Sequence, residues 1–172
     1  MIEQYINDID LNLLNHLFTF DMKNGKVFWK NPPKLHPRML GKEAGAKRLS
    51  GKNKYYCRIK INKKAVLRSH IIFYVANGFK AKPCIDHING NSLDDRPCNL
   101  RQATITENAW NHKFRKKSNN LPMGIRFQSN KFIARISHNK HQIHIGSFNK
   151  LDDAVNAYKQ KRIELYGQYS GY

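Results

Sequence analysis

The segment CIDHINGNSLDDRPCNLRQATITENAWN, from Cys84 to Asn111, changes its local chemistry several times over a short length. Ile85–Ile88 is typical of a strand end, and the Asn-Gly-Asn sequence at 89–91 is typical of a turn. Thr104 and Glu107 have the spacing of a capping box, which predicts that a helix begins there and runs over 104–113. The segment is therefore expected to fold as a strand, a loop, a return segment and a helix.

Four polar residues of this segment have the chemistry that phosphodiester hydrolysis needs. Adjacent residues on a strand point to opposite sides, so Asp86 and His87 can flank a substrate. In-line attack needs a base that takes a proton from water, and a histidine with a pKa of about 6.5 suits this role at neutral pH. Asp86 and Asn108 offer hard oxygen ligands, which suit magnesium when waters complete its shell. Asn99 is expected to fasten the loop to the backbone near His87 and so to fix the ring.

A plain Asx-rich turn is the alternative interpretation, because Asp, Asn and Gly together usually form turns. The charge of the chain favours the nuclease interpretation. The chain has 31 Lys and Arg residues against 12 Asp and Glu residues, a net charge of +19. A charge of this size and sign most often indicates a polyanionic partner, of which nucleic acid is the commonest. Charge binds phosphate whatever the sugar, so an RNA-directed enzyme stays open at this point.

Composition limits the classes of protein that the chain can belong to. Apolar residues make up 40% of the chain, so any core is small or divided. The three cysteines are widely spaced and form no C-x-x-C pair, which argues against a disulfide framework and against a structural zinc site. The N-terminus lacks the order of a signal peptide, and no apolar run approaches the length of a membrane span. We expect a soluble protein of a reducing compartment.

The first half of the chain is expected to contain two hairpins and two helices. The predicted order is a helix over 4–18, a hairpin in FTFDMKNGKVFWK, an extended basic loop over 30–54, a hairpin in YYCRIKINKKAVLRSH that turns at Asn62–Lys64, and a helix over 70–76 ended by Asn77-Gly78.

The last third of the chain has its own pattern. A polar, basic run at 113–120 suits a linker that lies along a phosphate backbone, and its candidate contacts are Lys113, Arg115, Lys116 and Lys117. Three strand-like runs follow, separated by the turn pairs 129–130 and 139–140. The segment from Leu151 then has near-helical apolar spacing, with acidic residues at its start and basic residues toward its end. Three strands and one helix are expected to form a small independent module.

The pattern D-H-I-N-G-N…D-D-R…N-L-R…E-N…N closely resembles the HNH (ββα-metal) nuclease motif of phage and intron-encoded homing endonucleases. The resemblance implies that Asp86 and Asn108 bind the metal, that His87 is the general base and that Asn99 orients it. The last position is Asn, which makes this the HNN variant. His112, one turn later, is an alternative ligand. His70, at the position of the histidine that opens the preceding helix in that family, is expected to be structural or to face phosphate.

Residues 121–170, with M-G-I-R-F, K-F-I-A-R-I and I-H-I-G-S-F, resemble the ethylene-response-factor (AP-two type) DNA-binding domain, which also occurs fused to phage HNH nucleases. The resemblance implies that the sheet lies in the major groove with the helix behind it. The residues that would face DNA are Arg126, Arg135, Ser137, Gln142 and His144. The residues that would hold the module together are Ala134, Gly146, Phe148 and Ala157. His144 stands where the plant domain usually has Trp, so the plant target sequence does not transfer.

Together these observations predict an α+β protein. We expect an N-terminal region and nuclease module over 1–112 (core 66–112), a linker over 113–120 and a DNA-binding module over 121–172. The predicted function is a homing-type DNA endonuclease that uses magnesium, or manganese in its place, acts as a monomer on double-stranded DNA, chiefly nicks it and works in the cytoplasm of a bacterial host cell. The alternatives are a regulatory DNA-binding protein whose nuclease has lapsed and a nonspecific nuclease of the bacterial-toxin kind.

Overall fold

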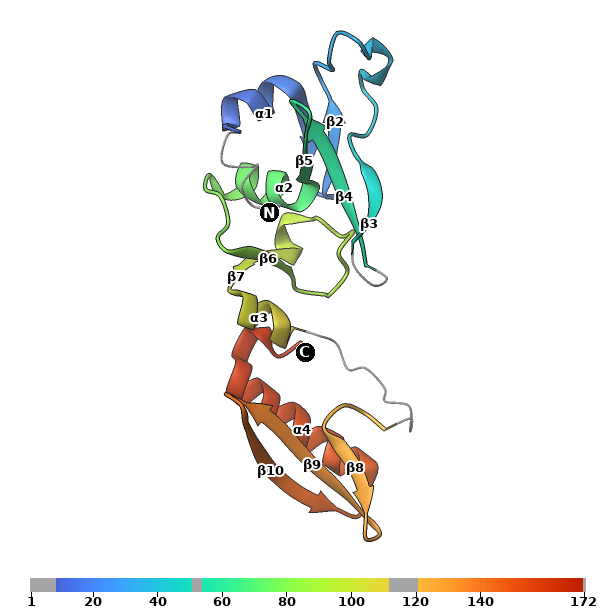
Figure 1. The fold of residues 1–172 in the computed structure, drawn as a ribbon, viewed down its shortest axis with the longest axis vertical. Helices are drawn as coiled ribbons and strands as arrows, with labels where there is room; N and C mark the ends of the chain where they lie inside the picture. The colour runs from blue at the N-terminus through green and yellow to red at the C-terminus, as the bar shows by residue number, and fades with distance from the viewer. Residues whose placement is uncertain (1–8, 51–53, 112–120, 172) are drawn as a thin grey trace. The chain divides into compact units, whose positions relative to one another are not determined.

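The computed structural model describes residues 9–50, 54–111 and 121–171. The chain divides into two compact units, Met1–Asn108 and Ala109–Tyr172. The boundary falls inside helix α3 (Ile105–Trp110), whose last two residues, Ala109 and Trp110, belong to the second unit. Figure 1 shows the order of the elements along the chain. Among the described residues, no helix is long and apolar enough to cross a membrane.

The first unit begins with a short helix and a hairpin. Helix α1 (Leu11–Leu17) starts at Leu11 because the Asp10 carboxylate caps it, accepting a hydrogen bond from the Leu13 amide at 2.7 Å. The hairpin pairs β1 (Phe18–Asp21) with β2 (Lys26–Trp29), as predicted. The predicted helix over 4–18 is wrong at residues 9–10 and at Phe18, which lie outside α1. Ile9 precedes the cap, and Phe18 opens β1, where its ring packs against Trp29; residues 4–8 lie outside the described residues.

A three-stranded antiparallel sheet follows, in the order β3-β4-β5. Its strands are β3 (Ala46–Ser50), β4 (Lys54–Ile61) and β5 (Lys64–Leu67). The predicted hairpin of β4 and β5 is confirmed, and Asn62 and Lys63 make its turn with positive φ angles. The expectation of a loop throughout 30–54 is wrong, because β3 pairs along β4 and a 3₁₀ turn forms at Pro37–Met39. Strand β3 was hidden from pattern analysis because it is almost wholly exposed and has no alternating apolar residues.

Helix α2 (Arg68–Asn77) ends at Gly78, which adopts a left-handed conformation with φ of 75°, as the Asn-Gly pair predicted. Its buried residues Ile71, Ile72 and Phe73 join the core of the first unit. The same core contains Leu14 from α1, and apolar side chains of the hairpin and of the three-stranded sheet. One small core thus ties the N-terminal hairpins to α2.

The segment from Cys84 to Asn111 folds as two strands and a helix, as predicted. Strand β6 (Cys84–His87) pairs with β7 (Leu100–Ala103), and a loop ending in a 3₁₀ turn at Pro97–Asn99 connects them. The capping box at the start of α3 is confirmed. The Thr104 amide donates to the Glu107 carboxylate at 2.7 Å, and the Glu107 amide donates to the Thr104 hydroxyl at 3.1 Å. The predicted extension to residue 113 falls partly outside the described residues, and Asn111 already lies in a turn.

The second unit consists of three antiparallel strands and one long helix, as predicted. The strands are β8 (Ile125–Gln128), β9 (Lys131–His138) and β10 (His141–Phe148), in the order β10-β9-β8. Both predicted turn pairs have positive φ angles. Helix α4 (Leu151–Tyr166) packs its buried residues Ala154 and Tyr158 against Ile125, Ala134 and Ile136 of the sheet. Both units together confirm the α+β class.

Candidate functional site

Strands β6 and β7 hold Asp86 in a buried ion pair. Asp86 lies opposite Arg101 in the strand register. The Nε and Nη2 atoms of Arg101 both donate to Asp86 Oδ2, at 2.8 and 2.6 Å. Asp86 is 3% exposed, so this ion pair lies in a place that water barely reaches.

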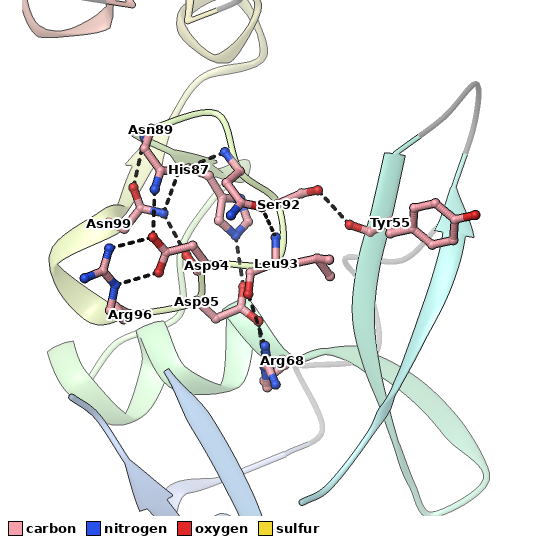
Figure 2. A network of polar contacts seen from close by, with 11 residues as sticks. Tyr55, Arg68, His87, Asn89, Ser92, Leu93, Asp94, Asp95, Arg96 and Asn99 are labelled. Carbon is pink, nitrogen blue, oxygen red and sulfur yellow. Dashed lines mark hydrogen bonds and ion pairs between the residues drawn. The ribbon is translucent and has the colours of Figure 1, made fainter. Parts of the chain in front are cut away.

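His87 is the last residue of β6, and its ring points into a network of polar side chains (Figure 2). Its Nε2 atom lies 2.9 Å from Oδ1 of Asp95. The other oxygen of Asp95 accepts a 2.7 Å hydrogen bond from Nε of Arg68, at the start of α2. All three side chains are buried, and Asp95 is only 2% exposed. The Nε2 side of His87 is therefore held by the Asp95 carboxylate, which is itself paired with the Arg68 guanidinium.

Asn99 fastens the loop between β6 and β7. Its Oδ1 accepts from the Asn89 amide at 2.9 Å, and its Nδ2 donates to the Asp94 carbonyl at 2.7 Å and to Asn89 Oδ1 at 3.1 Å. Asp94 accepts two hydrogen bonds from Arg96, which with the Asn89 amide group lower its pKa to about 2. These contacts place Asn99 beside the backbone that follows His87, where the sequence analysis expected it.

Asn108 lies on the same side of β6 as Asp86. Its Nδ2 atom is 3.8 Å from Sγ of Cys84, and Cys84 shares a strand face with Asp86 because the two residues are two positions apart. Carboxylate and amide carbonyl oxygens are hard donors of the kind that magnesium takes, so the residue types fit the ion, and in this structure the Asp86 carboxylate is paired with Arg101. Among the described residues, no three His, Cys, Asp or Glu side chains are grouped so that they could hold a metal ion. The alternative ligand His112 lies outside the described residues.

His70 lies on α2 near His87. Its Nδ1 atom is buried and has no hydrogen-bond partner among the described residues. Burial, followed by the neighbouring His87, lowers the pKa of His70 to about 4. His70 is therefore neutral at physiological pH, which agrees with a structural role better than with a charge contact to phosphate.

The five residues expected to face DNA lie together on the second unit. The register sets Ser137 opposite Gln142 and Arg135 opposite His144, on the face away from the buried Ala134 and Ile136. Arg126 extends the same face on β8, and it is exposed like all the others except the half-buried Arg135. Figure 1 shows α4 along the opposite face of this sheet. The linker residues Lys113, Arg115, Lys116 and Lys117 lie outside the described residues.

Sequence reasoning missed three residues of the site: Arg68, Asp95 and Arg101. Each was visible as a charged residue, but none has a spacing that points to its partner. Arg68 lies 27 positions before Asp95, and Arg101 lies 15 positions after Asp86. The one signal in the sequence was a charged residue directly after an apolar run, as in Ala65-Val66-Leu67-Arg68.

The comparisons with known proteins identify the class. Residues 66–110 match the family model described as HNH endonuclease, a stretch that begins in β5 and ends with α3. It contains the Asp86-His87 pair, the loop tied by Asn99 and the helix that carries Asn108. The chain thus carries a nuclease domain of the HNH type, a hydrolase.

Protein 3.8 of Escherichia phage T7 is 34% identical to this chain over 107 residues, which make up 60% of this chain and 88% of that protein. The chain therefore belongs to the same family as protein 3.8. No solved structure matches the chain. The resemblance of 121–170 to the ethylene-response-factor domain stays a prediction.

Proposed function

We propose that the chain is a homing-type endonuclease that hydrolyses one phosphodiester bond of double-stranded DNA per encounter. The observation that carries the proposal is the placement of His87 beside Asp86 at the end of β6, inside the HNH domain. The Nε2 atom of His87 contacts Asp95. Asp86 shares a strand face with Cys84, which Asn108 contacts. In the proposal His87 supplies the base, and Asp86 and Asn108 supply oxygen ligands for the metal.

In this proposal His87 accepts a proton from water through Nδ1. The water oxygen forms a bond to phosphorus, the bond between phosphorus and the leaving sugar oxygen breaks, and that oxygen takes up a proton from solvent. Asp86 and Asn108 would hold magnesium, or manganese in its place, which would stabilise charge on the phosphate and on the leaving oxygen. Asn99 keeps the backbone after His87 in place through its contacts with Asn89 and Asp94.

The outer face of the β8–β10 sheet is the proposed site of duplex recognition. Its side chains combine two arginines with hydrogen-bonding Ser, Gln and His residues, a set that contacts both phosphates and base edges. In this division of labour the first unit holds the reacting groups, and the basic residues of 113–120 add positive charge to the second unit. Because one chain carries one Asp86-His87 pair, we propose that the monomer chiefly nicks DNA.

The test is incubation of the full chain with supercoiled plasmid, with magnesium, with manganese and with EDTA. We expect open circles to form first and only in the presence of a divalent metal. Plasmid that stays supercoiled under every metal condition would refute the endonuclease. Linear product without an earlier open-circle stage would refute nicking by one site and would indicate paired cleavage.

A further inference from the structure

The buried chain of polar contacts behind His87 extends beyond the HNH match into the N-terminal region. Asp95 contacts His87 with one oxygen and Arg68 with the other. Arg68 then donates through Nη1 to Glu43 at 2.8 Å and through Nη2 to the Leu93 carbonyl at 3.2 Å. Glu43 precedes the matched stretch, which starts at residue 66. Three side chains from three separate segments thus form a chain of contacts, of which Asp95 touches the imidazole.

We propose that Asp95, anchored by Arg68 and Glu43, is a positioning residue that fixes the tautomer of His87 with the proton on Nε2. The inference rests on the proposed function, since it assigns the proton-free Nδ1 of His87 as the base. It also gives the N-terminal region a role in the reaction, because Glu43 is brought to Arg68 by the backbone bridge that it makes with Phe28 of the first hairpin.

The direction of each hydrogen bond follows from the donors and acceptors present. A guanidinium only donates, so Arg68 must give its Nε proton to Asp95. A carboxylate only accepts, so the contact between Asp95 and Nε2 requires a proton on Nε2. The Nε2 proton thus lies on the buried side, and in the neutral form of the ring the lone pair is then on Nδ1. Because Asp95 is 2% exposed, water does not compete for these contacts.

Backbone packing holds Asp95 at its place from a second direction. Gly25, in the turn between β1 and β2, sits so close to the loop that a Cβ there would lie 2.4 Å from Arg96 N and 2.5 Å from Asp95 C. The turn therefore buttresses the backbone that carries Asp95. Glu43 also pairs with Lys26 of β2 at 3.2 Å. The first hairpin thus supports both ends of the chain of contacts.

Asp95→Asn tests the assignment because it exchanges donor and acceptor at the contact with His87 Nε2 and keeps the size of the side chain. Arg68 still needs an acceptor, so the new amide must turn its oxygen toward Arg68 and its NH₂ group toward His87. Nε2 then has to accept, which moves the ring proton to Nδ1 and blocks the base. In a serine-protease triad a change of this kind costs on the order of 10⁴ in kcat with the geometry intact.

The experiment measures three quantities in the full chain. Long-range ¹H–¹⁵N spectra show which ring nitrogen of His87 carries the proton, with His87→Ala as the assignment control. Plasmid nicking at saturating DNA gives the maximal rate, and a titration gives DNA affinity. Asp94→Asn is the matched control, because Asp94 is the adjacent carboxylate and pairs with Arg96 instead of Arg68. Its side chain makes none of the contacts described for Arg68.

We expect Asp95→Asn to place the proton on Nδ1 and to lower the maximal rate about 10²–10⁴-fold with unchanged affinity. Asp94→Asn should keep the proton on Nε2. Combining Asp95→Asn with Arg68→Met should return it to Nε2, because the amide oxygen is then released to face His87. A proton that stays on Nε2 in Asp95→Asn, or that moves equally in Asp94→Asn, would overturn the proposal.

Two further outcomes are separable. If circular dichroism shows that Asp95→Asn is unfolded, Glu43→Gln takes its place, because Glu43 is partly exposed. A lower maximal rate of Glu43→Gln at unchanged DNA affinity supports the proposal. An unchanged rate overturns it. If the wild-type chain nicks no DNA under any metal condition, the proposed function fails. The ring spectra still decide in that case whether Asp95 sets the tautomer.

Discussion

Replacing Gly25 with alanine is expected to damage both stability and the candidate site. Gly25 has a φ of 64°, where an alanine costs roughly 1–2 kcal/mol. The added Cβ would also meet the backbone of Asp95 and Arg96 at 2.4–2.5 Å, which cannot be relieved by turning a side chain. Overpacking of this kind costs about 1–3 kcal/mol, so the free energy of unfolding should fall by about 2–5 kcal/mol. Because the clash falls on the backbone of Asp95, the nicking rate should fall as well.

Gly41→Ala is the matched control for this prediction. Gly41 has a similar φ of 71°, but a Cβ there would meet nothing within 4 Å. Denaturant unfolding of both variants should therefore show a loss of about 1–2 kcal/mol for Gly41→Ala and a larger loss for Gly25→Ala. Equal losses, with equal nicking rates, would refute the idea that the hairpin turn supports the Asp95 loop.

Three other predictions concern the metal, the pH and the DNA-facing sheet. Asp86→Ala and Asn108→Ala should each abolish metal-dependent nicking, and full activity of either variant would move the metal site elsewhere. As pH falls below 6.5, His70 takes up a proton in the unfolded chain, whereas in the folded chain it does so only near pH 4. The free energy of unfolding should therefore fall by up to about 3 kcal/mol between these two pH values. His70→Gln should remove that part of the pH dependence in thermal melts. Arg126→Ala or Arg135→Ala should cost about 1–3 kcal/mol of binding on a preferred duplex if the side chain reads a base, and equal losses on scrambled duplexes would indicate phosphate contact alone.

The elements that sequence analysis predicted well are those with strong local chemistry. The turn pairs Asn62-Lys63 and Asn139-Lys140 need positive φ angles, and the Thr104-Glu107 capping box satisfies its own backbone groups. Local signals of this kind are complete within a few residues. They do not depend on the rest of the fold.

The features that were missed depend on contacts between distant segments. Strand β3 exists because β4 offers it a pairing edge, although its own side chains are exposed. The partnership of Arg68 with Asp95 is created only when α2 packs under the β6–β7 loop. Trp110 shows the same limit: it was assigned with the nuclease helix, but its ring stacks on Tyr166 of the second unit at 4.7 Å. Such pairings follow from tertiary packing, which a pattern along one chain does not encode.

The most direct test of the central claim is the single-turnover nicking rate of His87→Ala on saturating plasmid, measured beside its DNA affinity. His16→Ala, an exposed histidine on α1, is the control for loss of an imidazole. We predict that His87→Ala lowers the rate about 10²–10⁴-fold with the affinity unchanged, because a general base acts on water and adds little to duplex binding. A rate close to that of the wild type and of His16→Ala would show that His87 is not the base and would contradict the account.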